Sequence, residues 1–123
     1  TIARSLAIGN PADGPYAIDE MRHSGGDCGS VSDDEVLASI AQLARTEGVF
    51  AETAGGVVIA SLKQLVERGS IDREQSIVAI ISGHGLKTLD AIVDTAVPTA
   101  IISPKLADAE EALARNHQLE AAV

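Results

Sequence analysis

The apolar run at residues 77–81, followed at once by Ser82, Gly83 and Gly85, constrains the fold of this chain most strongly. A continuous run of Ile, Val and Ala predicts a strand that is buried on both faces of a parallel sheet. Ligands of such sheets bind just beyond the carboxyl ends of the strands. Ser82 therefore occupies a candidate ligand site, and the two glycines allow the backbone to pass close to a neighbour.

Two familiar phosphate-binding motifs do not fit the turn that follows this strand. A P-loop requires glycine directly before lysine, whereas Leu86 separates Gly85 from Lys87. A dinucleotide fingerprint requires a third glycine, where Thr88 stands. Ser82 also lacks the Gly-x-Ser-x-Gly context of a nucleophilic serine. The local pattern leaves two interpretations open, a ligand site and an ordinary glycine turn.

Composition narrows the fold class and the possible partners. The 123 residues suggest one domain, and only 2% of them are aromatic, which favours small aliphatic side chains on helices and parallel strands. We therefore expect an α/β fold with few parallel strands and flanking helices. The net charge of −9 argues against nucleic acid and against anionic membranes. The single cysteine excludes an internal disulfide and predicts a cytoplasmic location.

The pattern predicts three helices before the apolar run. The first spans residues 15–24 and directs Ile18 and Met21 inward, with Gly25 as its end. The second begins at Ser32, which forms a capping box with Glu35, and ends at Gly48. Its inner stripe is Val36, Ile40 and Leu43.

The third predicted helix, residues 53–68, is apolar nearly all round and should be buried on most sides. Gly55 and Gly56 are unfavourable inside a helix, so we expect another backbone or a ligand to approach closely there. Glu52 stands at the start of this helix. From the residues alone its carboxylate either faces solvent or holds a partner in a polar pocket, and the first is favoured because burying a free charge is unfavourable.

The remaining segments give weaker signals. A short strand is predicted within residues 1–8, a helix over 89–97, a strand over 98–103 and a helix over 104–122 with Leu106, Leu113 and Leu119 inward. The histidines and the cysteine lack the close paired spacing of zinc ligands, so no metal site is expected.

Four blocks of the chain, taken in order, resemble the carboxyl-terminal part of the threonine synthases, pyridoxal-phosphate enzymes of fold type II. The blocks are Ser-Leu-Ala-Ile-Gly-Asn-Pro-Ala-Asp-Gly (5–14), Val-Ser-Asp-Asp-Glu (31–35), Glu-Gly-Val-Phe-Ala-Glu-Thr-Ala-Gly-Gly (47–56) and Ser-Gly-His-Gly-Leu-Lys-Thr (82–88). The resemblance covers residues 1–90, and residues 91–123 form a tail. It implies that residues 1–123 are a carboxyl-terminal fragment of the family's larger, cofactor-binding domain.

The resemblance also implies roles for individual residues. In this family a serine or threonine at the position of Ser82 hydrogen-bonds the pyridine nitrogen of pyridoxal 5'-phosphate, and Gly83 lies beneath the ring. Glu52 and Thr53 match the block on the cofactor side. Gly9 and Asn10 match a turn on the substrate side. None of Lys63, Lys87 and Lys105 stands in the family's Schiff-base context, so no catalytic residue is expected in this chain.

By the same resemblance, the whole enzyme is a lyase that converts O-phospho-L-homoserine and water to L-threonine and phosphate. It is also expected to be a homo-oligomer. The fragment alone is expected to be inactive. Two alternatives remain open at this stage. A serine or threonine dehydratase would share the fold, and a non-catalytic interaction module could derive from such an enzyme. The blocks at 9–11 and 84–87 favour threonine synthase over the dehydratases.

Overall fold

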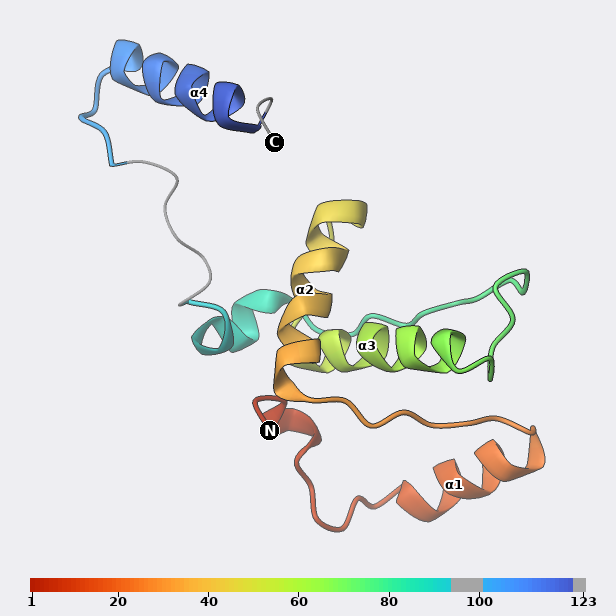
Figure 1. Ribbon diagram of the computed structural model, residues 1–123. Helices are drawn as coiled ribbons and strands as arrows, with labels where there is room; N and C mark the ends of the chain where they lie inside the picture. Colours follow the sequence, from red (N-terminus) through yellow and green to blue (C-terminus); the bar gives the residue numbers. More distant parts are fainter. Residues whose placement is uncertain (94–100, 121–123) are drawn as a thin grey trace. The chain divides into compact units, whose positions relative to one another are not determined.

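The computed structural model describes residues 1–93 and 101–120 and divides into two units, Thr1–Ile92 and Val93–Val123. The first unit holds η1 (Arg4–Leu6), α1 (Gly14–His23), α2 (Asp33–Glu47), α3 (Thr53–Glu67) and η2 (Gly85–Ala91) (Figure 1). The second unit holds α4 (Leu106–Glu120). No described helix has the length and apolar character needed to cross a membrane.

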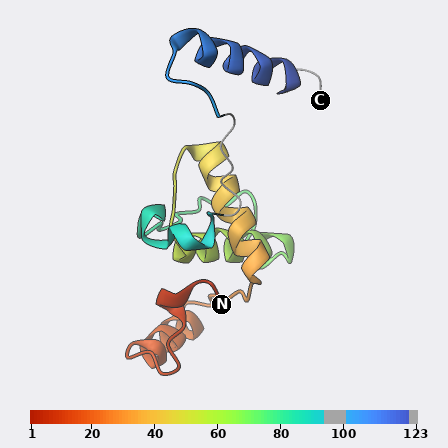
Figure 2. The ribbon, with the colours of Figure 1, turned by 90° about the vertical axis from the view of Figure 1, so that its left-hand side faces the viewer.

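The pair α2 and α3 forms the centre of the first unit. The two helices cross at a steep angle in both views (Figures 1 and 2). The predicted stripe of α2 is confirmed, since Val36, Ile40 and Leu43 are all buried. A Cβ on Gly56 would lie 2.8 Å from Ile40 Cγ1 and 2.8 Å from the Val36 carbonyl oxygen. The close approach predicted for the glycine pair of α3 is therefore a helix–helix contact at Gly56, whereas a Cβ on Gly55 would meet Ala51 and Ile81.

The ends of α2 are those that its sequence predicts. Ser32 Oγ accepts from the Glu35 N–H at 3.3 Å, and Glu35 Oε2 accepts from the Ser32 N–H at 2.6 Å. This reciprocal pair satisfies two donors that the first turn would otherwise leave free. Gly48 ends the helix in the left-handed conformation, with φ of 68°. Both predicted ends are confirmed.

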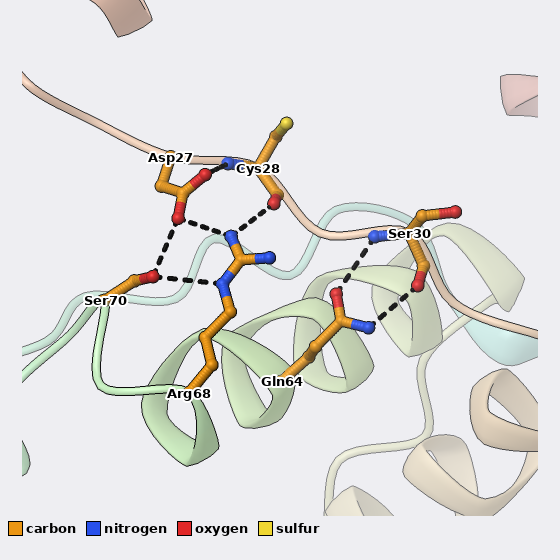
Figure 3. A network of polar contacts seen from close by, with 6 residues as sticks. All are labelled: Asp27, Cys28, Ser30, Gln64, Arg68 and Ser70. Carbon is orange, nitrogen blue, oxygen red and sulfur yellow. Dashed lines mark hydrogen bonds and ion pairs between the residues drawn. The ribbon is translucent and has the colours of Figure 1, made fainter.

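A polar network holds the segment before α2 against the end of α3 (Figure 3). Arg68, which follows α3, forms an ion pair with Asp27 and donates to the Cys28 carbonyl oxygen at 2.6 Å. Gln64 brackets Ser30, accepting from its N–H at 3.0 Å and donating to its carbonyl oxygen at 2.9 Å. The hydrogen bond from the Ser70 hydroxyl is the main cause of a lowered pKa at Asp27, and the Cys28 N–H and Arg68 add to it.

The predicted strand at residues 77–81 is wrong for this structure. The residues run beside α3 without forming a strand, and residues 76–82 make no hydrogen bond within the described part of the chain. Val78 is 88% exposed and Ile80 is 77% exposed. A strand requires a neighbouring strand to pair with its backbone groups, and no described segment supplies one. The α/β fold is therefore not confirmed, and an isolated antiparallel bridge between Ala51 and His84 is the sheet pairing found in the described residues.

This missing sheet also changes the expected burial of α3. One face of the helix is buried against α2, but Val58 remains exposed and Val57 is only half-buried. The second face borders an apolar groove shared with residues 77–80 and with the segment at 27–29. Only Val58, Lys63 and Glu67 of α3 are exposed, so the prediction that this helix is buried on most sides is confirmed in part, and the side along this groove remains open.

The ends of the chain bring further corrections. Residues 4–6 form η1 rather than a strand, and the Thr1 hydroxyl and Ile2 N–H both donate to Asp33. No residue of α1 is buried, so Ile18 does not point into a core. The helix expected at 89–97 begins earlier, as η2, and residues 94–97 lie outside the described residues.

In the second unit, residues 101–103 form no strand, and 98–100 lie outside the described residues. The helix predicted over 104–122 is confirmed as α4, whose bounds are narrower. Leu106 and Leu113 are exposed rather than inward, since α4 is the one helix described in its unit. The side chain of Leu119 lies outside the described residues.

Candidate functional site

Two segments that are distant in the sequence meet in front of α3. The Glu52 N–H donates to the Gly83 carbonyl oxygen at 3.2 Å, and the Gly85 N–H donates to the Phe50 carbonyl oxygen at 3.0 Å. These bonds form the antiparallel bridge between Ala51 and His84. They bring the block that starts α3 against the turn that follows the apolar run. Four predicted site residues, Glu52, Thr53, Ser82 and Gly83, thereby come together.

The carboxylate of Glu52 lies inside this junction. Glu52 is 4% exposed, and its two carboxylate oxygens lie 3.1 Å and 3.0 Å from Lys87 Nζ. The expectation that this side chain faces solvent is wrong. A buried carboxylate is tolerated when a cation neutralises it, and Lys87 supplies that cation from η2. Glu52 is the N-cap residue of α3 but makes no side-chain cap bond, and its carboxylate pairs with Lys87 instead.

Gly83 is required by this arrangement. Its φ of +82° lies in the left-handed region, which residues other than glycine adopt only with an unfavourable conformational free energy. A Cβ there would also overlap the Glu52 carboxylate. A Cβ on Gly85 would overlap the Phe50 ring, which itself lies edge-on to His84 at a centroid distance of 5.6 Å. The glycines admit close neighbours, as predicted, and in this structure those neighbours belong to the chain itself.

Thr53 lies at the first position of α3 and is fully buried. Its N–H donates to Thr88 Oγ1 at 3.2 Å, so one orphan donor of the helix terminus is satisfied by η2. Its own hydroxyl oxygen is buried and makes no hydrogen bond within the described part of the chain. Thr53 therefore belongs to the inner side of the junction and presents no surface to a ligand.

Ser82 stands on the outer side of the same turn. It is exposed, and its hydroxyl makes no hydrogen bond to any other described residue. A serine hydroxyl can donate one hydrogen bond and accept others, and it carries no charge. These properties fit the nitrogen of an aromatic ring as a partner, so the residues present are compatible with a cofactor wall of this kind.

Gly9 and Asn10 are not brought to this junction by any contact among the described residues. Both are exposed in the turn between η1 and α1. Asn10 borders a shallow hollow formed with Pro11 and the first turns of α1. Elsewhere, no group of three or more metal-binding side chains lies together in residues 1–93 and 101–120.

Sequence reasoning missed Lys87 and Thr88, which hold the junction together. Lys87 was considered only as a possible cofactor lysine or P-loop lysine. A signal was available, because Lys87 is the one lysine or arginine of the glycine-rich block 82–88, and the glycine-rich block 47–56 carries only acidic charges, Glu47 and Glu52. Opposite charges in segments that must be buried together predict a pair. No comparable local signal points to Thr88.

Comparisons with known proteins show the family to which the chain belongs. Residues 1–83 match the family model described as pyridoxal-phosphate dependent enzyme. The chain therefore belongs to the pyridoxal-phosphate dependent enzyme family, whose members use that cofactor. Among its relatives, the threonine synthase of Methanocaldococcus jannaschii is 47% identical over 93 residues, which make up 76% of this chain and 23% of the relative.

Two further relatives extend the similarity towards the end of the chain. The threonine synthase of Methanosarcina acetivorans is 35% identical over 92% of this chain and 28% of its own length. That of Halalkalibacterium halodurans is 36% identical over 95% of this chain and 32% of its own length. The chain thus spans between about a quarter and a third of these curated relatives.

Proposed function

We propose that this chain forms one wall of the cofactor site of a threonine synthase. The observation that carries the proposal is the junction of residues 50–53 with residues 82–88, two blocks that carry the family resemblance. The threonine synthases to which the chain is similar extend well beyond the matched part. The proposed whole protein converts O-phospho-L-homoserine and water to L-threonine and phosphate. Its α/β sheet, cytoplasmic location and homo-oligomeric state remain proposals as well.

Within that site, the proposed role of Ser82 is a hydrogen bond to the pyridine nitrogen. Pyridoxal phosphate, when bound, supplies the electron-withdrawing ring that elimination and replacement reactions of amino acids require. A neutral hydroxyl does not hold a proton on that nitrogen as strongly as a carboxylate does. Gly83 keeps the backbone beside Ser82 free of side-chain bulk. Glu52 and Thr53 support the turn from behind, and Gly9 and Asn10 belong to the proposed substrate side.

Replacing the matched stretch of the Methanocaldococcus jannaschii enzyme with the corresponding stretch of this chain tests the function. We expect the chimera to form threonine and phosphate in equal amounts from O-phospho-L-homoserine. Ser82→Ala in the chimera should lower kcat/KM by roughly tenfold or more, because one transition-state hydrogen bond is lost. Ser82→Thr keeps the hydroxyl and should retain most of the activity.

The 123-residue chain alone, mixed with pyridoxal phosphate and O-phospho-L-homoserine, should form no threonine. Threonine formation by this chain alone would contradict the expected need for a lysine from elsewhere. A chimera that releases 2-oxobutanoate from threonine, and makes no threonine, would instead support the dehydratase alternative. An inactive chimera that is folded and binds the cofactor would contradict both.

A further inference from the structure

Lys87 makes the contact on which the burial of Glu52 depends. Its ammonium group lies 3.1 Å and 3.0 Å from the two carboxylate oxygens. The side chain of Glu52 is only 6% exposed, whereas that of Lys87 is 62% exposed. The lysine therefore covers a buried charge from the solvent side. Without it the carboxylate would be both buried and unpaired, which is among the costlier arrangements in a protein.

Thr88 makes a second contact directly beside the first. Its hydroxyl oxygen accepts from the Thr53 N–H at 3.2 Å. Two consecutive residues of η2 thus bind the two consecutive residues at which α3 begins. Thr88 is also where η2 kinks, with φ of −133° and ψ of 42°, so the chain departs from helical geometry where this hydroxyl turns to α3.

The turn at residues 82–85 carries the antiparallel bridge itself, and the contacts of Lys87 and Thr88 follow directly after it in the chain. On one side the Gly83 carbonyl oxygen and the Gly85 N–H are bonded to residues 52 and 50. On the other side Lys87 and Thr88 bind residues 52 and 53. Residues 76–82, which precede the turn, make no hydrogen bond within the described residues. The hydrogen bonds that position Ser82 therefore all follow it in the chain, while the residue before it, Ile81, makes an apolar contact with Gly55 of α3.

We propose that Lys87 and Thr88 are positioning residues that clamp η2 to the start of α3 and so fix the exposed hydroxyl of Ser82. The role of that hydroxyl towards the cofactor rests on the proposed function, while the clamp itself does not. A hydrogen bond between a hydroxyl and a ring nitrogen tolerates changes of only a few tenths of an ångström in the donor–acceptor distance. A turn that moves further than this loses the hydrogen bond. Lys87 acts through Glu52, and Thr88 acts through Thr53.

Amide hydrogen exchange on the 123-residue chain tests the clamp without cofactor or substrate. Lys87→Met should speed exchange at the Glu52 and Gly85 amides by roughly tenfold or more, as expected when a charged hydrogen bond is removed. It should also lower the ¹⁵N heteronuclear NOE of Ser82 and Gly83. Lys87→Arg should restore both readouts, because the exposed side chain leaves room for a guanidinium group that binds carboxylates.

Lys63→Met is the matched control. Lys63 faces Glu67 at 3.9 Å on the surface of α3, so the same charge is lost where both partners are exposed. We expect no change at Glu52, Gly85 or Ser82. Thr88→Val should speed exchange at the Thr53 amide and lower the heteronuclear NOE of Ser82, and Thr88→Ser should reverse both effects, since serine keeps the acceptor.

Two results would overturn the proposal. One is unchanged exchange and unchanged NOE at the turn in Lys87→Met. The other is faster exchange spread evenly over α2 and α3, since that pattern reports general stability rather than positioning. If Lys87→Met does not fold, the double variant Glu52→Gln with Lys87→Met removes both charges, and the same two readouts apply to it.

The hydrogen-exchange experiment tests the clamp and the chimera tests the proposed function, so either proposal can be contradicted without the other. A clamp that opens in Lys87→Met while the chimera makes no threonine would leave the positioning role of Lys87 standing and remove the proposed function. An active chimera together with an unchanged turn would do the opposite.

Discussion

Gly83 shows at the scale of one residue how tightly the junction is built. Its backbone has a φ of +82°, and the space that a side chain would fill is taken by the Glu52 carboxylate. Glu52 cannot easily move away, because it is buried and paired with Lys87. Two separate constraints, one on backbone conformation and one on space, therefore act on the same residue.

Gly83→Ala should destabilise the chain more than Gly25→Ala does. Gly25 also has positive φ, at 68°, but a Cβ there would meet nothing within 4 Å. The control should lose about 1–2 kcal/mol for the left-handed conformation alone. Gly83→Ala should lose about 1–3 kcal/mol more for overpacking. Urea unfolding followed by circular dichroism measures both, and equal losses would mean that Glu52 yields freely.

The first turn of α2 is the clearest case at the scale of an element. Ser32 and Glu35 exchange two hydrogen bonds, and the Ser32 N–H is the main cause of a lowered pKa at Glu35. The cap stabilises the helix against which α3 packs. Its contribution should therefore appear in the stability of the pair rather than in α2 alone.

Ser32→Ala should lower the free energy of unfolding by about 1 kcal/mol, because a helix donor loses its acceptor. Thr46→Ala on the same helix is the control. The Thr46 hydroxyl donates only to the Gln42 carbonyl oxygen within α2, at 3.1 Å, and such bonds add little to stability. Thermal unfolding should separate the two variants by several degrees. Equal midpoints would contradict a role for the cap.

Two acidic side chains, Asp27 and Asp33, join separate parts of the first unit, and a third, Glu35, holds the cap of α2. Hydrogen bonds lower the pKa of Asp27, chiefly from the Ser70 hydroxyl, and the pKa of Asp33, chiefly from the Thr1 hydroxyl. The pKa of Glu35 is lowered as well. All three carboxylates are favoured in their charged form by contacts that exist only in the folded chain.

The unit should therefore lose stability in acid. A carboxyl group whose pKa is lower in the folded chain contributes stability above its unfolded value of about 4. That contribution is lost as pH falls through the lower, folded values. Unfolding midpoints measured between neutral pH and pH 3 should fall below about pH 4, and Asp33→Asn should reduce the fall. Midpoints that stay constant or rise in acid would contradict these assignments.

The sequence predicted local structure well and long-range structure poorly. The capping box at Ser32, the stripe of α2 and the left-handed Gly48 are set by residues within a few positions of one another, and all are confirmed. The strand predicted at 77–81 is wrong, because a strand needs backbone hydrogen-bond partners from another part of the chain. Within the described residues no backbone pairs with this segment, and residues 77–80 lie exposed while Ile81 is half-buried.

In the candidate site too, contacts between distant parts of the sequence could not be predicted from local patterns. Family resemblance identified Glu52, Thr53, Ser82 and Gly83 together, whereas spacing alone left an ordinary turn as an equal alternative. The burial of Glu52 could not be inferred from its neighbours in sequence, because its partner is 35 residues away. A search for complementary charges between glycine-rich blocks would have found Lys87.

Residues 76–82, which make no hydrogen bond within the described part of the chain, also affect how readily the protein aggregates in concentrated solution. Five successive apolar residues, three of them isoleucine, carry no charge and no proline, and their backbone groups have no partner in the described part of the chain. Segments of this composition stack readily with copies of themselves into cross-β fibrils. Asp72, Arg73 and Glu74 stand just before the run, where flanking charges act as gatekeepers against stacking. Substitutions that neutralise those charges should shorten the lag before fibril growth, even where they leave the folded junction untouched.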